Sequence, residues 1–351
     1  MIRDTVFKII QRRRILEVKK LPASRLNEAV ELADRVFKPI DGSMGKNFSI
    51  LFSKKNAHNI LFIEEDKKIV SMVGMYYAYA QIFTSRIKVA FIGAVCTAEN
   101  YRGQGYATKI TYEAMQVALK NDATLMMIHG DNDIYRNFGA VDAGTYFTIE
   151  IMPRYNLPSS TLKKATDDDL KKMAIWHSKE PVRFIRSFSN FKLFYKVGHA
   201  WDGHAETFIN DSAYITVVKK EGINHCIEFA GDPNSIAILI QNFANEYGLT
   251  IVHLTLANKD CISRLLLEPP KRRQFYGTMI VLDKFKLLDQ LKDYLDESIS
   301  GTDKGVLNVK LTNFDNSSFA KIIFGSTEIS PEFKNELFPI PLPDYHGMDY
   351  I

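Results

Sequence analysis

The sequence of 351 residues has few cysteines and no obvious metal-binding pattern. Its three cysteines, Cys96, Cys226 and Cys261, stand far apart. An odd number of separated thiols indicates neither a disulfide framework nor a Cys-x-x-Cys metal or redox site. His199 and His204 lie close in sequence but have no third ligand and no HExxH pattern. We therefore expect buried free thiols and no metal.

Long apolar runs and blocks of one charge are also missing. The first residues lack the sustained apolar core of a secretory signal, and no later window is apolar over the length that spans a bilayer. We therefore expect a cytoplasmic protein with no membrane partner. Lysine and arginine number 45 and aspartate and glutamate 41, interspersed, for a net charge of +4. This balance does not indicate a nucleic-acid partner.

The length favours more than one domain. Residues 1–153 read as a mixed domain of order β-α-β-β-β-α-β-α-β, which ends with a strand near residues 146–151. Prolines and serines then indicate a linker. Residues 154–283 repeat the strand order of the first half, and residues 284–351 form a small α/β unit with an apolar, proline-rich tail that we expect to dock. The predicted fold class is α+β, or mixed α/β, with a central mixed sheet.

Two glycines stand between a predicted strand and a predicted helix over residues 107–120, in the run Arg-Gly-Gln-Gly-Tyr-Ala at 102–107. The first N–H groups of a helix have no internal partners, and the helix dipole favours negative charge there. The small residues permit close approach of an anion. A P-loop is excluded because its Gly-Lys-Ser/Thr ending is missing, and the dinucleotide fingerprint fails on spacing and context. The run predicts a pyrophosphate site.

The surroundings of this turn carry a resemblance to a known family. Val95 and Thr97 lie upstream on the strand, the turn reads Arg-x-x-Gly-x-Ala at 102–107, and the segment DIYRNFGA follows the next strand at 133–140. Together they resemble the GNAT acetyltransferase superfamily, although Glu99 stands where many members have proline. The resemblance implies acetyl-coenzyme A, with its pyrophosphate on the turn and its pantetheine arm along the strand. The implied cofactor-binding residues are Val95, Cys96, Thr97, Arg102, Gly103, Gln104, Gly105, Tyr106, Ala107 and Thr108.

The three-part layout is similar to the enhanced-intracellular-survival type of acetyltransferase. That type has an active GNAT domain, a GNAT-like domain without the motif and a sterol-carrier-like end, and it tends toward homo-oligomers. In the second half, the place of the glycine turn reads Gly-Asp-Pro-Asn at 231–234. Pro233 has no N–H, so we expect no phosphate there. Residues 284–351 are short for the sterol-carrier-like unit.

Acyl transfer from a thioester to an amine needs a neutral nucleophile, a stabilised oxyanion and a proton for the departing thiolate. The backbone N–H of Val95 or Thr97 is a candidate to polarise the thioester carbonyl. Tyr135 matches the tyrosine that protonates the thiolate in the resembled family, and an ordinary tyrosine pKa of about 10 suits a donor at neutral pH. The alternative for Tyr135 is a packing aromatic at the start of a helix.

The general base stays open. In the resembled family the terminal carboxylate enters the active site, which here implies the carboxylate of Ile351, although the family usually ends on an aromatic residue. The alternative is an ordinary docked tail. His129 follows the strand next to the expected pantetheine arm, where a histidine is either a base or a hydrogen-bonded structural residue. Asp131 and Glu99 are further candidates.

These features predict an N-acetyltransferase that passes acetyl directly from coenzyme A to a primary amine. Polyamines, aminoglycosides and lysine side chains suit the resembled family, and each is a cation that would need an acidic pocket. One alternative is a sensor or scaffold that binds acyl-coenzyme A without turnover. Another is a tandem GNAT-like transferase that uses charged transfer RNA, which the near-neutral charge and the intact glycine turn of the first half disfavour.

Overall fold

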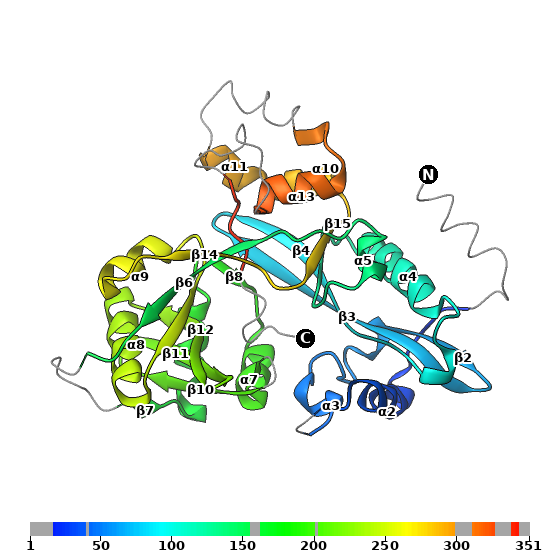
Figure 1. The fold of residues 1–351 in the computed structure, drawn as a ribbon, viewed down its shortest axis with the longest axis horizontal. Coiled ribbons are helices and arrows are strands. Elements are labelled where there is room, and N and C mark those ends of the chain that lie inside the picture. The colour runs from blue at the N-terminus through cyan, green and yellow to red at the C-terminus, as the bar shows by residue number, and fades with distance from the viewer. Residues whose placement is uncertain are drawn as a thin grey trace.

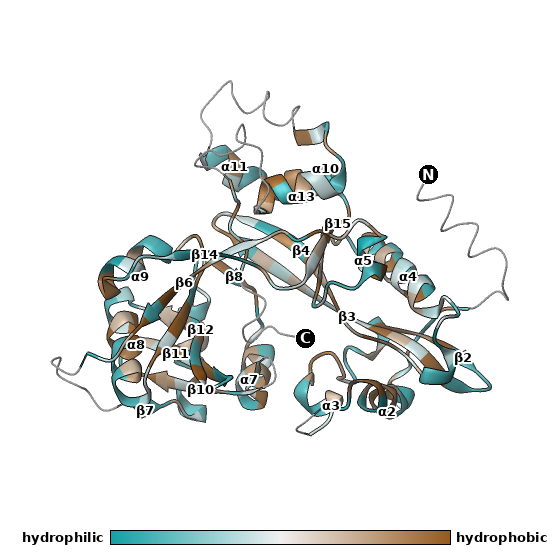
Figure 2. Ribbon diagram, in the orientation of Figure 1, coloured by the Kyte–Doolittle hydropathy of each residue, from teal (hydrophilic) through white to brown (hydrophobic). Residues whose placement is uncertain are grey.

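The computed structural model describes two β-sheets that lie side by side, with C-terminal helices packed on the first (Figure 1). We call the halves around them the first and second lobes. Figure 2 shows that apolar residues follow the strands of both sheets, against which the hydrophobic cores pack. Among the described residues no helix is long and apolar enough to cross a membrane. The described residues are 17–39, 42–154, 162–200, 203–298, 311–326 and 338–343.

In the described chain the first sheet has seven strands, in the order β1-β2-β3-β4-β5-β15, with β8 also paired to β3. Neighbouring strands are antiparallel except β4 and β5, which are parallel. The turn between β2 and β3 is polar, as expected, and both of its central residues, Asp66 and Lys67, have positive φ. The strands are β1 (Lys19–Lys20), β2 (Ile60–Glu65), β3 (Lys68–Ile82), β4 (Ser85–Thr97), β5 (Leu125–Ile128), β8 (Val182–Phe184) and β15 (Thr278–Val281).

Both faces of the first sheet are covered by helices. Val89 and Phe91 of β4 belong to one core, and Ala90 and Ile92 belong to the other, as alternation along a strand requires. Helix α4 lies on the Ala90 face, and α2 lies on the Val89 face. The helices of this lobe are η1 (Ala23–Arg25), α2 (Leu26–Phe37), α3 (Met44–Asn47), η2 (Ala57–Asn59), η3 (Glu99–Tyr101), α4 (Tyr106–Lys120) and α5 (Asp133–Arg136).

The second sheet has eight strands in the described residues, in the order β14-β6-β13-β12-β11-β10-β7, with β9 also paired to β10. Helices α8 and α9 pack on one face, and α6 and α7 pack on the other. The strands are β6 (Thr145–Ile151), β7 (Lys163–Lys164), β9 (His199–Ala200), β10 (Gly203–Ile209), β11 (Ala213–Lys220), β12 (Ile223–Gly231), β13 (Thr250–Leu254) and β14 (Lys271–Gln274). The helices are η4 (Asp167–Asp169), α6 (Leu170–His177), α7 (Phe188–Val197), α8 (Pro233–Tyr247) and α9 (Lys259–Leu266).

The two sheets share a pairing pattern. In the first, β2, β3 and β4 are antiparallel and β4 leads through α4 to the parallel strand β5. In the second, β10, β11 and β12 are antiparallel and β12 leads through α8 to the parallel strand β13. The second half therefore repeats the strand order of the first.

Each sheet is completed by a strand from the other half of the sequence. We expected residues 146–151 to close the first lobe, but β6 pairs with β13 and β14 in the second sheet. Strand β15, which follows the second lobe in sequence, returns to pair with β5 in the first. The sequence predicted a strand near residues 146–151 but carries no information on its partners, and the strand at residues 278–281 was not predicted. The boundaries at residues 153 and 283 stay predictions.

The described part of residues 284–351 contains helices and no strand. The small α/β unit that we expected stays a prediction, because residues 299–310, 327–337 and 344–351 lie outside the described residues. Leu287, Leu291 and Phe319 are buried in the same core as Phe91 of the first sheet. These helices therefore extend the first core instead of enclosing one of their own. They are α10 (Lys284–Gln290), α11 (Lys292–Ser298) and α13 (Asn316–Phe324).

The beginning of the proline-rich tail is docked on these helices. Phe338, Ile340 and Leu342 are buried, and the N–H of Ile340 donates to the carbonyl of Ile323 at 2.7 Å. The remainder of the tail, from residue 344, lies outside the described residues.

Replacing Gly144 tests the junction between the exchanged strands. An ideal Cβ on Gly144 would lie 2.3 Å from Phe275, and its φ is +96°. We expect Gly144→Ala to lower the free energy of unfolding by about 3 kcal/mol, from overpacking and backbone strain together. Gly222→Ala is the control, because φ there is +84° with no atom within 4 Å. Gly222→Ala should lower the free energy of unfolding by about 1 kcal/mol, from backbone strain alone. Equal shifts in urea denaturation would contradict the packing argument.

Candidate active site

Strand β4 carries a β-bulge in the segment where the pantetheine arm was expected. Between the pairs Gly74–Gly93 and Met72–Cys96, two residues of β4, Ala94 and Val95, face a single residue of β3. Ala94 has φ +50°, which is unusual for a residue with a side chain. Such a bulge bends its strand and turns its backbone groups out of the regular ladder.

The parallel pairing of β4 with β5 stops just before this bulge. The last pair is Ile92 with Ile128. Strand β4 continues to Thr97, whereas β5 gives way to His129 and Gly130. Within the described chain, no ladder pair joins β4 to β5 beyond Ile92. The backbone of β4 from the bulge onward is therefore released from its neighbour on this side.

The glycine turn after β4 has a left-handed backbone at both of its glycines. Gly103 and Gly105 have φ +73° and +83°, and no atom lies within 4 Å of an ideal Cβ on either residue. Gly105 is the N-cap of α4, and no side chain caps the helix. The exposed side chain of Gln104 donates to the carbonyl of Asn100 at 3.4 Å. The turn therefore presents an uncapped helix start to open space, the arrangement that binds anions.

The remaining predicted cofactor residues flank this turn. The Arg102 Nε donates to the carbonyl of Thr97 at 3.3 Å, and the Thr97 hydroxyl lies 2.9 Å from that of Ser71. Tyr106 has a buried ring whose hydroxyl donates to Glu65 at 3.1 Å. The ring is thus directed into the protein, away from the turn. Ala107 and Thr108 form the first turn of α4 beside it.

The corresponding helix start in the second lobe is closed. The Asp232 side chain accepts a hydrogen bond from the N–H of Ser235, and Pro233 occupies the first turn of α8. An ideal Cβ on Gly231 would lie 2.2 Å from the carbonyl oxygen of Ser212. A carboxylate therefore occupies the place of an incoming anion.

Tyr135 lies on α5, beside the split between β4 and β5. The helix begins at the Asn132 cap, whose side chain accepts from the N–H of Ile134. The Tyr135 ring lies 3.8 Å from an ideal Cβ on Gly130, and its hydroxyl interacts electrostatically with the Cys96 thiol. Burial raises the pKa of Tyr135 to about 12. No hydrogen bond to this hydroxyl occurs among the described residues.

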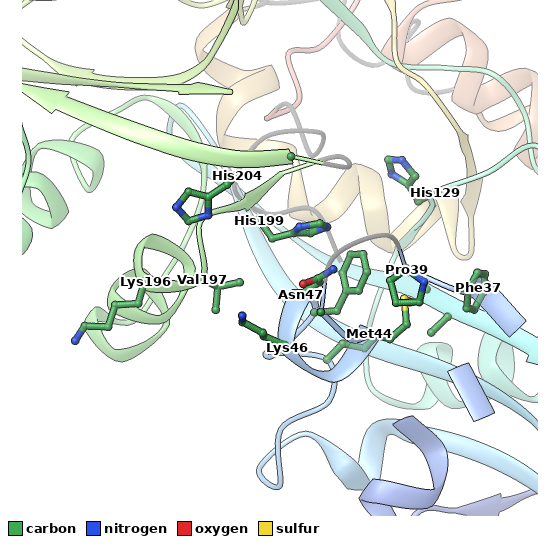
Figure 3. A pocket seen from close by; sticks show the side chains of 16 residues that line it. Phe37, Pro39, Met44, Lys46, Asn47, His129, Lys196, Val197, His199 and His204 are labelled. Carbon is green, nitrogen blue, oxygen red and sulfur yellow. The ribbon is translucent and has the colours of Figure 1, made fainter. Parts of the chain in front are cut away.

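A cavity of about 690 Å³ opens between the lobes at the bulge (Figure 3). Gly93 and Ala94 of β4 line it together with His129, which follows β5. The second lobe contributes His199 and His204 from the β9–β10 hairpin. The cavity therefore connects the free backbone of β4 with side chains of both lobes.

Of the candidate general bases, only some line the cavity among the described residues. His129 lines the cavity, and its ring centroid lies 5.6 Å from that of Tyr276. Glu99 and Asp131 are exposed and do not line it. Ile351 lies outside the described residues. Cys96 is buried, which raises the pKa of its thiol to about 12.

Sequence reasoning did not identify the residues with which the second lobe lines the cavity. We considered His199 and His204 only as metal ligands, and Lys46 of α3 carried no motif. All three line the cavity. Each is distant in sequence from β4, so no local pattern joins them to the site. The pairing of the exchanged strands, which holds the lobes together, brings these residues to one cavity, and the sequence did not predict that pairing.

Comparisons with known proteins concern the first lobe and the overall fold. Residues 17–141 match the family described as Acetyltransferase (GNAT) domain. This part of the protein is therefore the domain of an acetyl-coenzyme A-dependent acetyltransferase, and the expected enzyme class is confirmed there. No curated protein sequence matches the chain.

Solved structures of similar fold cover most of the chain. A GCN5-related N-acetyltransferase from Kribbella flavida has a TM-score of 0.59 at 13% identity, over 78% of this chain and 72% of that one. A probable N-acyltransferase from Enterococcus faecalis has 0.60 at 15%, over 78% and 74%. Eis1 from Mycobacterium abscessus has 0.56 at 10%, over 76% and 74%. These likenesses show that the mixed α/β fold is that of GNAT proteins.

The open and closed helix starts predict one coenzyme A site per chain. A carboxylate at the start of α4 would reproduce the closed arrangement of α8, so we expect Gly105→Asp to weaken coenzyme A binding at least about tenfold in calorimetry. Gly222→Asp is the control, since its φ of +84° matches the +83° of Gly105 and its Cβ position is equally open. Two sites per chain, or unchanged affinity in Gly105→Asp, would contradict this prediction.

Proposed function

We propose that this protein is an N-acetyltransferase that passes acetyl from acetyl-coenzyme A directly to a primary amine. The proposal rests on one observation: the bulge of β4, the open glycine turn and the cavity lie next to one another. The bulged end of β4 leads into the open glycine turn, and the cavity lined by Gly93, Ala94 and His129 begins at the same bulge. The acetyltransferase domain match over residues 17–141 supports this reading.

In this proposal the cosubstrate lies along β4 and across the start of α4. The pantetheine arm runs beside the backbone of Val95, Cys96 and Thr97. The pyrophosphate accepts hydrogen bonds from the N–H groups of the turn at residues 102–108, where Gly103 and Gly105 leave room for it. The Arg102 side chain, held to the Thr97 carbonyl, connects the two parts of the site.

The proposed reaction needs no covalent enzyme intermediate. The amine nitrogen attacks the thioester carbonyl carbon, a C–N bond forms, and the negative charge on the carbonyl oxygen is stabilised by the N–H of Val95 or Thr97 at the bulged end of β4. The C–S bond then breaks. Tyr135 supplies the proton that the leaving thiolate takes up, and its high pKa keeps the hydroxyl protonated.

The amine must lose a proton in the same reaction. His129 is the base that we propose from the described residues, because it lines the cavity beside Ala94. An imidazole titrates near neutral pH and can accept the proton and release it to solvent. The Ile351 carboxylate stays the competing proposal from the family resemblance.

We also propose that the chain is of the enhanced-intracellular-survival type. Its support is the repeated strand order, the closed start of α8 and the likeness to Eis1 in fold. A sterol-carrier-like role for residues 284–351, a cytoplasmic location and a homo-oligomeric state stay predictions.

Tyr135→Phe tests the acid. We expect turnover to fall about 100-fold or more, because only the proton donor is removed, while coenzyme A affinity stays within about twofold of the unmutated value. The assay is acetyl-coenzyme A-dependent thiol release over polyamines, aminoglycosides, amino acids and lysine peptides. Tyr112→Phe on α4 is the matched control, since it removes the hydroxyl of a tyrosine whose ring packs beside Phe138 and to which the proposal gives no role. Saturable binding without release from any acceptor would favour a sensor.

The pH profile tests the same assignment. Because burial raises the pKa of Tyr135 to about 12, its neutral donor form persists well above pH 10. We therefore expect kcat to rise as the amine and the base lose protons and then to stay level to at least about pH 10. A descending limb near pH 9 that disappears in Tyr135→Phe would contradict this prediction. It would show that the pKa of Tyr135 lies near 9 and not near 12.

A further inference from the structure

The cavity has one side built from both lobes. His199 and His204 form a direct cross-strand pair on the β9–β10 hairpin, so their side chains leave the same face of it. Lys46 of α3 faces them from the first lobe. In Figure 3, His199, His204 and Lys46 lie on one side of the cavity, and His129 lies on the other. We call His199, His204 and Lys46 the basic side.

Packing holds the basic side in shape. The ring centroids of Phe48 and His199 lie 5.1 Å apart with an edge-to-face geometry, which joins the end of α3 to the hairpin. An ideal Cβ on Gly198 would lie 2.7 Å from the His204 ring, so only glycine leaves room for that ring. The N–H of Ala205 donates to the Gly198 carbonyl at 2.6 Å and closes the hairpin.

Among the described residues, the titratable side chains that line the cavity are lysines and histidines. The described lining contains Lys46, Lys196, His129, His199 and His204 but no aspartate or glutamate. Lys196 is paired with Asp167 at 2.9 Å. Lys46 forms no ion pair within the described chain. A bare polycation would therefore meet repulsion on the basic side, whereas an anion would be attracted.

We propose that the acceptor is an amine that also carries an anionic group, a carboxylate or a phosphate. This inference rests on the proposed function and names its substrate class. The anionic group lies against Lys46 and His204, and the amine points toward Ala94 and His129. Positive groups near an amine also lower its pKa, which increases the share of the neutral nucleophile. Polyamines or aminoglycosides would need an acidic pocket. In this inference the pocket is basic, and the acceptor carries the anionic group.

Pairs of amines that differ by one anionic group test whether the acceptor must carry such a group. L-Lysine is compared with cadaverine, L-ornithine with putrescine, and phosphoethanolamine with ethanolamine, by thiol release from acetyl-coenzyme A. We expect kcat/KM to be about tenfold or more higher for the anionic member of at least one pair, as a charge-assisted hydrogen bond provides. The carboxylate and phosphate pairs distinguish the two anions. Equal rates within all pairs, or a preference for the bare amines, overturn the inference.

Variants of the basic side give a second readout. Lys46→Met and His204→Gln should each raise KM for the anionic acceptor about tenfold. KM for its bare partner should stay unchanged or fall, because Lys46→Met removes a positive charge that repels a cation. Lys54→Met is the matched control, because Lys54 is an exposed lysine of the first lobe that does not line the cavity. An equal effect of Lys46→Met on both members of a pair would show a merely structural role and overturn the inference.

A binding measurement separates this inference from the proposed function. The same amines are titrated calorimetrically into the full chain saturated with coenzyme A. Anionic amines that bind with dependence on Lys46 but release no thiol support the basic side and overturn the transferase proposal. Preferential turnover of cadaverine or ethanolamine supports the transferase and overturns the basic side. Absence of both binding and turnover for every member overturns the inference.

Discussion

The exchange of β6 and β15 is the constraint on which the rest of the architecture depends. Strand β6 leaves the first half to pair with β13, and β15 returns from the second half to pair with β5. Backbone ladders, which are directional and fixed in register, therefore tie each lobe to the other. This fixes the β9–β10 hairpin opposite α3, so that the cavity has walls from both lobes. Without the exchange, neither sheet would have its observed edge.

Much of the local structure could be predicted because its causes are local. The polar turn at Asp66 and Lys67 and helix α4 follow from residue type and spacing. The burial on helix α2 depends on the tertiary structure: its buried face includes Ala29 and Leu32, and Phe37 at its end is 45% exposed. The exchanged strands could not be predicted in the same way, because alternation shows that a segment is a strand and says nothing of its neighbours.

The residues of the candidate site also fall into two groups, those with a local sequence signal and those that only the tertiary structure brings together. The glycine turn was readable because positive φ is a property of single residues, and Tyr135 was readable from its spacing to a Phe-Gly pair. The bulge at Ala94 gave no sign, since alanine has no preference for positive φ. The histidines of the β9–β10 hairpin join the site only through the tertiary structure. Local chemistry was thus visible in the sequence, and the side that would meet the acceptor was not.

The same exchange sets an order of events while the chain is being made. Strand β6 is available before the sheet that receives it, but β5 has no partner on its outer edge until β15, at residues 278–281, has left the ribosome. Until then the first sheet presents an apolar strand edge, from Leu125 to Ile128, which can pair with other chains. The amino-terminal lobe therefore completes its folding after the second lobe has been synthesised, although it comes first in the sequence.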